Sequence, residues 1–424
     1  MAAHLDEVAR RGGRGYGLPL EVLWGAGEER LDPVTGEIVP RPETRATEGG
    51  GFFVHAHYGL RYVGEGLTVV GIFTMLMFAA LITGLIVHKR IFKDFFTFRP
   101  NKGTRSWLDA HHVFGLMVLP FLLMIVYSGL ALNLGGYMPA PEVVIPDEEK
   151  PREFPSPVTR PAVPMAEVVA RAEAILGKGE IGGISIGREG EKLQIDVSRY
   201  WGTQYPIADR ENSLQFDGET GERLPPENFT FGQAPAWKAL WYLAGLHYAW
   251  FAGMNLRWLY FISGLVGCAV IATGLILWTT RRRARHERGA AETGRPAFGF
   301  QLVEKLNIAT IAALPIAVAA YFWANRLLSF TMAERAEWEV HTLFLLWGWL
   351  AYYALLRPAR RAWVELFALA AAAFAFLPVL NAFTTDKHLA ATITHGDWAL
   401  AGVDLTFLAF GAGFGGIAWV LRRR

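Results

Sequence analysis

The sequence LTVVGIFTMLMFAALITGLIV occupies residues 67–87 and contains no charged side chain. Two further stretches, residues 113–134 and 258–280, are also longer than 20 residues and free of charge. About 20 residues at a rise of ~1.5 Å cross the ~30 Å hydrocarbon core of a bilayer as an α-helix. These stretches therefore predict transmembrane helices, and the fold class they indicate is a membrane all-α helical bundle.

Four more apolar stretches follow, at residues 306–325, 342–356, 366–383 and 399–421, which gives about seven predicted transmembrane helices. Lys and Arg are concentrated in alternate connections: residues 88–112 and 281–295 hold six each, and residues 357–361 and 422–424 hold three each. Basic loops stay in the cytoplasm. We therefore expect a multi-pass protein of the bacterial inner (cytoplasmic) membrane, surrounded by lipid, with a cytoplasmic C-terminus.

The polar insert at residues 135–240 has the pattern of a small α+β domain on the outer side of the membrane. Residues 165–176 form an amphipathic pattern, and residues 184–187, 192–199 and 213–216 are predicted strands. In the middle strand the apolar residues Leu193, Ile195 and Val197 alternate with polar ones. The run Asp217-Gly218-Glu219-Thr220-Gly221 then predicts a turn.

An internal repeat with a spacing of 190 residues organises the first part of the chain. His57-Tyr58 matches His247-Tyr248, and Thr83-Gly84-Leu85-Ile86 matches Thr273-Gly274-Leu275-Ile276 at the same spacing. Both copies run from the outer to the inner side, which makes the repeat parallel. Only the second copy follows a predicted membrane helix, so we expect an upstream helix to be missing before residues 1–50.

Several motifs resemble the PepSY-associated transmembrane family, whose members include ferric-siderophore reductases. These motifs are Phe52-Phe53 with His57, the run from Thr83 to Pro100, Trp107-Leu108-Asp109-Ala110-His111, Trp241-Tyr242-Leu243 with Gly245-Leu246-His247, and Arg257-Trp258-Leu259-Tyr260. The resemblance implies a partial periplasmic PepSY-like segment (1–50), two transmembrane units (51–134 and 241–285), a PepSY-like domain (135–240) and a four-helix membrane region (302–424). Arg61 stands where the family pattern leads us to expect a second histidine.

Histidines flank the apolar stretches and suggest haem ligands. Neutral imidazole is an axial ligand of haem iron, and coordination by two histidines leaves no open position, which favours electron transfer over oxygen chemistry. We predict one outer haem between His57 and His247 and a cytoplasmic-side haem between His88 and His111. Arg61 and Arg257 are candidates for contact with the outer propionates. The single cysteine, Cys268, cannot supply a C-x-x-C-H motif, so these two b-type haems would be held non-covalently.

Other interpretations of these residues stay open. A histidine that flanks a membrane helix is often only an interfacial side chain. His112 could replace His111, and His55 with His57 forms a weak two-residue metal motif. Asp404 is a charge within the last apolar stretch and thus a nominal functional candidate. We also expect Gly64, Gly66, Gly253 and Asn255 to break the helices after His57 and His247, since straight helices would hold the two haems too far apart.

The sequence contains no G-x-G-x-x-G motif after a predicted strand, no P-loop and no cysteine cluster, so we expect electrons to come from a quinol or a donor protein. The expected function is electron transfer across the inner membrane that reduces a periplasmic ferric siderophore for iron uptake. The chain would then be a membrane oxidoreductase. The alternatives are a non-redox PepSY scaffold that assists siderophore uptake or regulates a protease, and a transporter. No feature points to nucleic acid as a partner.

Overall fold

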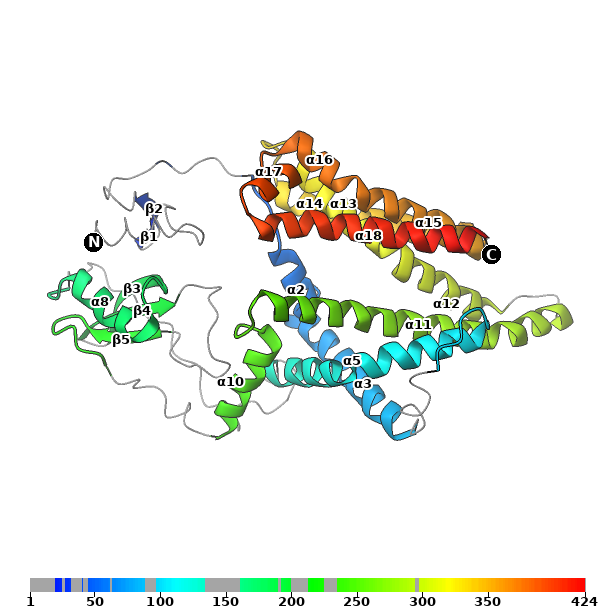
Figure 1. Ribbon diagram of the computed structural model, residues 1–424, viewed down its shortest axis with the longest axis horizontal. Helices are drawn as coiled ribbons and strands as arrows, with labels where there is room; N and C mark the ends of the chain where they lie inside the picture. Colours follow the sequence, from blue (N-terminus) through cyan, green and yellow to red (C-terminus); the bar gives the residue numbers. More distant parts are fainter. Residues whose placement is uncertain are drawn as a thin grey trace. The chain divides into compact units, whose positions relative to one another are not determined.

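The structure is a computed structural model that describes residues 20–24, 27–31, 40, 45–61, 63–87, 97–133, 161–189, 192–199, 213–224, 235–293 and 297–423 (Figure 1). The chain divides into two compact units that interleave along the sequence. Unit 1 contains Met1–Thr44, Leu67–Ala80 and Phe121–Phe261, and unit 2 contains Arg45–Gly66, Leu81–Pro120 and Ile262–Arg424. Each unit is described by itself.

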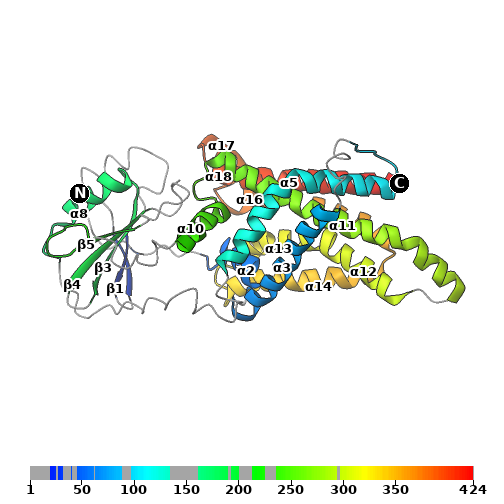
Figure 2. The same cartoon turned by 90° about the horizontal axis from the view of Figure 1, so that it is seen from below.

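Unit 1 contains the small α+β domain that the sequence predicts. Strands β3 (Ile181–Glu189), β4 (Lys192–Arg199) and β5 (Ser213–Asp217) form an antiparallel sheet in the order β3-β4-β5. Helix α8 (Met165–Leu176) packs on this sheet, as Figure 2 shows. The core contains Val168, Ala172, Leu176, Ile195, Val197, Leu214 and Phe216. Ile195 and Val197 of β4 and Leu214 and Phe216 of β5 are thus buried on the face that α8 covers, with the period of two expected for a strand.

Two smaller features complete the polar part of unit 1. Strands β1 (Leu20–Trp24) and β2 (Gly27–Leu31) form an antiparallel hairpin. The predicted turn after β5 is held by Asp217, whose Oδ1 accepts hydrogen bonds from the backbone N–H groups of Glu219 (2.8 Å) and Thr220 (2.9 Å). Gly221 in this turn has a φ of +67°, a conformation that favours glycine.

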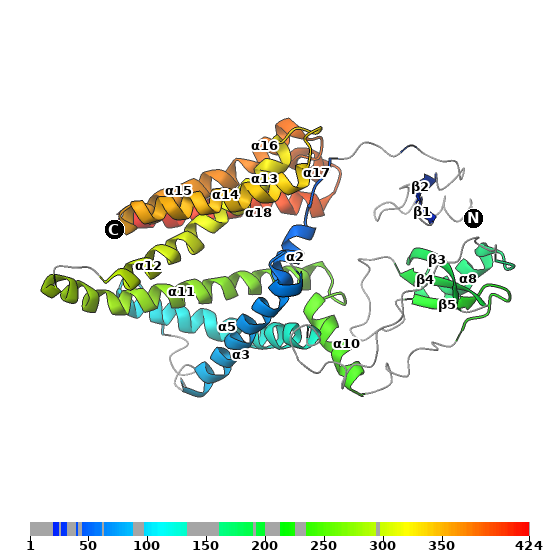
Figure 3. The ribbon, with the colours of Figure 1, turned by 180° about the vertical axis from the view of Figure 1, so that it is seen from behind.

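Unit 2 contains a C-terminal helical bundle (Figure 3). Its members are α12 (Phe298–Ile308), the π-helix η1 (Ala309–Ala313), α13 (Leu314–Leu327), α14 (Arg335–Leu356), α15 (Ala359–Ala375), α16 (Leu377–Thr384), α17 (Leu389–Thr394) and α18 (Trp398–Arg423). The carbonyl of Ala309, the first residue of the π-helix, accepts hydrogen bonds from the backbone N–H of Leu314 and from Trp347 Nε1, the latter at 2.9 Å. Helices α15 and α18 approach closely because Gly411 lies against Ala375.

Six helical segments in the described part of the chain are long and apolar enough to cross a membrane: Gly64–Val87, Thr104–Leu132, Met254–Gly289, Phe298–Leu327, Ala359–Thr384 and Trp398–Arg423. They contain six of the seven predicted spans. The remaining one, residues 342–356, is the apolar part of α14, whose first turns carry Arg335, Glu337 and Glu339. A seventh crossing by α14 therefore stays a prediction.

Both copies of the repeat have a helix break just after the repeated histidine. Helix α2 (Gly51–Gly59) is followed by Leu60 and Arg61 with positive φ, and α3 (Val63–Val87) begins after them. Helix α10 (Pro235–Tyr248) is followed by Ala249 with positive φ, and α11 (Met254–Thr293) begins five residues later. The breaks are thus aligned at the repeat spacing.

The predicted break positions were only partly right. Gly253 lies in the second break, but Gly64, Gly66 and Asn255 are helical. Gly66 has a different role, since a Cβ at this position would lie 1.8 Å from the carbonyl oxygen of Gly59. It permits the close approach of α3 to the end of α2.

Candidate functional site

His247 lies in the last turn of α10 and is held by α5 (Thr104–Leu132) within unit 1. Its Nδ1 is 2.9 Å from Ser128 Oγ, and the Ser128 hydroxyl donates to the carbonyl of Ile125 at 3.2 Å. In the tautomer in which Nδ1–H donates to Ser128 Oγ, the lone pair of neutral His247 lies on Nε2.

The space beside the His247 ring depends on a glycine. A Cβ at Gly129 would lie 3.1 Å from His247 Cε1, tighter than an ordinary contact. The carbonyl of Gly129 accepts a hydrogen bond from Asn133 Nδ2 at 3.0 Å, which fixes the end of α5 next to the ring. Ser128 and Gly129 could not be identified from the sequence, because only the packing of α10 on α5 brings them to His247.

His111 lies near the start of α5 and contacts α11 within unit 2. Its Nδ1 is 3.1 Å from the carbonyl oxygen of Val270 and 3.3 Å from Thr273 Oγ1. A carbonyl oxygen can only accept, so Nδ1 carries the proton and the lone pair lies on Nε2. A Cβ at Gly274 would be 3.3 Å from His111 Cε1. The repeated Thr-Gly pair at residues 273–274 thus surrounds this imidazole.

His111 and His247 therefore have the same local arrangement. In each, Nδ1 lies within hydrogen-bond distance of a protein oxygen, and a glycine lies against Cε1. A hydrogen bond from the second ring nitrogen fixes the tautomer and orientation of metal-binding histidines. Both residues fit the role of an axial ligand that coordinates through Nε2.

Asp109 fixes the first turn of the helix that carries His111. The Asp109 side chain is 1% exposed and forms ion pairs with Arg99 Nε at 3.0 Å and Arg105 Nε at 3.1 Å. Its Oδ2 also accepts the backbone N–H of Arg99 at 3.1 Å. A buried carboxylate with two guanidinium partners holds the connection before α5 against the helix. Asp109 belongs to the motif that ends in His111, but its role could be assigned only from these ion pairs.

The other predicted site residues have different surroundings. His57 is exposed on α2 and lies in unit 2, whereas His247 lies in unit 1, so the pairing of these two histidines stays a prediction. His88 is outside the described residues, and its pairing with His111 is likewise untested. Arg61 forms ion pairs with Glu337 and, at 3.9 Å, with Glu48. Arg257 Nε donates to the carbonyl of Ala252 at 3.0 Å.

The remaining polar candidates do not form a metal centre. The described residues contain no group of three or more His, Cys, Asp and Glu side chains that could hold a metal ion. His55 is exposed beside Tyr58, and His112 is half-buried. Asp404 is buried and accepts a hydrogen bond from Asn381 Nδ2 at 2.7 Å, while Arg326 Nε donates to Asn381 Oδ1 at 2.9 Å. This chain of contacts joins α13, α16 and α18.

Comparison with known proteins places the chain in a family. The family model of the PepSY-associated TM region matches residues 17–281, more than half of the chain. The chain therefore belongs to the PepSY-associated transmembrane family and is a multi-pass membrane protein. It is similar to a Pseudomonas aeruginosa protein with the name "Uncharacterized protein PA4219", with 25% identity over 400 residues, 84% of this chain and 91% of the relative.

Proposed function

We propose that this chain is a b-type haem protein of the bacterial inner membrane that transfers electrons outward and reduces a ferric siderophore in the periplasm. The observation that carries the proposal is the shared arrangement at His111 and His247, in which Nδ1 is anchored to a protein oxygen and a glycine lies against Cε1. A histidine that is merely interfacial needs neither a fixed tautomer nor a glycine beside its ring.

The two anchored histidines depend on opposite ends of one membrane-spanning helix. His111 is near the start of α5, whereas Ser128 and Gly129, which hold His247, are near its end. Haem at each histidine would supply one-electron redox chemistry at the two ends of this span. His88 and His57 are the proposed second ligands, and two histidine ligands leave no open coordination position for oxygen.

The electrons would come from a quinol or a donor protein. A quinol releases two protons and two electrons, so each quinol oxidised would reduce two ferric chelates to the ferrous state. The siderophore as substrate rests on the resemblance to the ferric-siderophore reductases of the family.

A visible spectrum of the purified full-length protein tests this proposal. We expect a low-spin b-type reduced-minus-oxidised spectrum and about two haems per chain by pyridine haemochrome. His247→Ala and His111→Ala should each remove one haem. Ser128→Ala should weaken retention of the His247 haem by roughly 10- to 100-fold, the usual effect of losing a hydrogen bond to a ligating histidine.

His395→Ala is the matched control. His395 Nδ1 is 2.7 Å from the carbonyl of Ala391, but its side chain is exposed. We expect this variant to retain both haems. Wild-type protein that carries no haem after expression with ample haem supply would overturn the redox function and favour a non-redox scaffold.

A further inference from the structure

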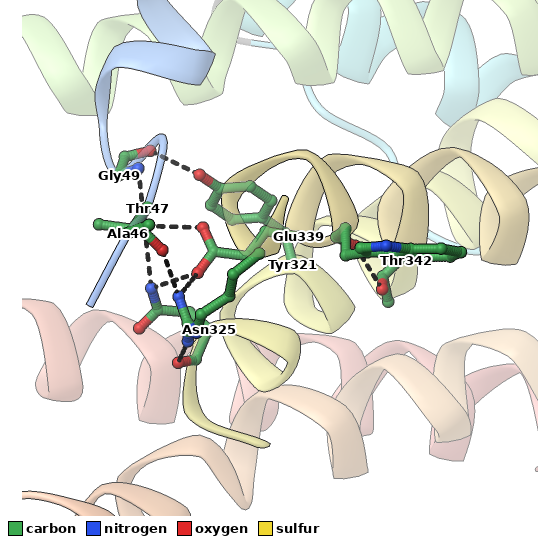
Figure 4. Close-up of polar contacts among 9 residues, drawn as sticks. Ala46, Thr47, Gly49, Tyr321, Asn325, Glu339 and Thr342 are labelled. Carbon is green, nitrogen blue, oxygen red and sulfur yellow. Dashed lines mark hydrogen bonds and ion pairs between the residues drawn. The ribbon is translucent and has the colours of Figure 1, made fainter. Parts of the chain in front are cut away.

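The segment that leads to His57 is fastened to the C-terminal bundle by polar contacts within unit 2, which Figure 4 shows. Glu339 of α14 is at their centre. Its Oε2 accepts from Thr47 Oγ1 at 2.7 Å, and its Oε1 accepts from Asn325 Nδ2 at 2.8 Å. Asn325 Nδ2 also donates to Thr47 Oγ1 at 3.0 Å. Thr47 is thus held by two side chains of the bundle.

Arg335 completes this network from one turn earlier on α14. Its Nη1 donates to Glu339 Oε1 and to the carbonyl of Ala46, both at 2.6 Å, and its Nη2 donates to the carbonyl of Asn325. The side chains of Arg335 and Glu339 are both 0% exposed. A buried ion pair of this kind is costly to break on one side, because the remaining charge is left uncompensated.

Aromatic contacts continue the attachment from Gly49 into α2. Tyr321 Oη donates to the carbonyl of Gly49 at 2.9 Å, and the Tyr321 ring stacks on Phe52 with centroids 5.2 Å apart. Phe53 stacks on Phe322 at 5.7 Å. Phe52, Phe53 and Ala56 of α2 all pack in this cluster, whereas His57 is exposed. The bundle therefore covers one face of α2 and leaves His57 outside that face.

The orientation of α2 has to come from these contacts. It is nine residues long, and an isolated helix of fewer than about 12 residues is unstable in water. The break at Leu60 and Arg61 also separates it from α3. Arg61, in this break, pairs with Glu337 of α14, and Thr47, before α2, bonds to Glu339 of the same helix. Helix α14 therefore contacts the segment on both sides of His57.

We infer that the C-terminal bundle positions His57 through the Arg335–Glu339 pair, so that this bundle is required to build the outer haem site. The inference rests on the proposed function. It assigns a role to a region that lies beyond residue 281, where the family match ends. Arg335 and Glu339 are positioning residues in this scheme, since they act on His57 through Ala46, Thr47 and the short helix α2.

Hydrogen exchange and haem spectra of the full-length protein test the inference together. In Arg335→Met the unpaired Glu339 should loosen the attachment, and exchange of the amides in residues 45–61 should rise roughly 100-fold. The double variant Arg335→Met/Glu339→Leu leaves no buried charge, so the bundle should fold as in wild type. It still lacks the Arg335 contact to Ala46 and the Glu339 contact to Thr47, and residues 45–61 should therefore still exchange faster.

The haem readout separates positioning from general stability. Both variants should either lose the outer haem or change its midpoint potential and low-spin EPR signature. The haem at His111 should stay unchanged in both. Arg283→Met is the control, because Arg283 pairs with Glu304 at a more exposed site and should alter neither readout. A double variant with wild-type exchange and an unchanged outer haem overturns the inference, whereas wild-type protein without haem overturns the proposed function itself.

Discussion

Replacing Gly66 by alanine tests the corner between α2 and α3. A Cβ at Gly66 would lie 1.8 Å from the carbonyl oxygen of Gly59 and 2.5 Å from its carbonyl carbon. Carbon and oxygen atoms approach to about 3.3 Å even in close C–H···O contacts. The substitution therefore requires a backbone movement of about 1.5 Å. No side-chain rotation can relieve the clash, because the backbone fixes the position of an alanine Cβ and the Gly59 carbonyl is also part of the backbone.

The size of the effect follows from two opposing terms. Alanine in place of glycine within a helix stabilises by up to about 1 kcal/mol. Overpacking in a close-packed site costs about 1–3 kcal/mol, with larger values when the obstacle is rigid. At Gly64, two residues earlier in α3, an added Cβ would meet nothing within 4 Å. Gly64→Ala should therefore show only the gain in helix propensity. The difference in unfolding free energy between the two variants then gives the cost of the contact between residue 66 and Gly59, about 1–3 kcal/mol.

The assay is a comparison of unfolding midpoints in detergent by tryptophan fluorescence, combined with hydrogen exchange of residues 51–66. We expect Gly66→Ala to unfold at a lower midpoint than Gly64→Ala and to exchange faster at the corner. Gly64→Ala should match or slightly exceed wild type. Equal midpoints and equal exchange for the two alanine variants would refute the close approach of Gly66 to Gly59.

Further substitutions test the packing elsewhere. Ile195→Ala in the core of the small α+β domain should lower the free energy of unfolding by about 2–5 kcal/mol, whereas Ile184→Ala, at an exposed position of β3, should have little effect. Thermal unfolding monitored by circular dichroism compares the two variants. Gly411→Val should separate α15 from α18 and lower the unfolding midpoint, and Gly413→Val, at a position with open space, should not. Asp109→Asn should raise hydrogen exchange in residues 97–110, because the buried carboxylate loses its charge opposite Arg99 and Arg105.

The local structure of the α+β domain was predictable because it depends on short-range pattern. The predicted helix at residues 165–176 and strand at residues 192–199 agree with α8 and β4 at both ends. Alternation of Ile195 and Val197 with polar neighbours identifies the buried face of a strand without knowledge of its partners. The prediction for β5 was one residue short and that for β3 was five residues short, since strand ends depend on pairing with β4.

The helix breaks after the two histidines were predictable in kind but not in position. Glycines were predicted to form the breaks, yet Leu60, Arg61 and Ala249 adopt positive φ. A non-glycine residue takes this conformation only when surrounding contacts compensate for its cost. At both breaks, backbone hydrogen bonds close onto the preceding helix, from Arg61 N–H to the carbonyl of His55 and from Ala249 N–H to the carbonyl of Gly245. The local sequence does not indicate that Arg61 pairs with Glu337, which is 276 residues away.

The sequence by itself determined the membrane class, the repeat and the identity of the candidate histidines, because hydrophobic length and repeated motifs are properties of the linear chain. Only the tertiary structure decided which groups hold these histidines. Ser128 and Gly129 meet His247, Val270 and Gly274 meet His111, and Arg335 and Glu339 fasten the segment before His57. The physical reason is that ring orientation, tautomer and burial depend on contacts between helices that are distant in sequence.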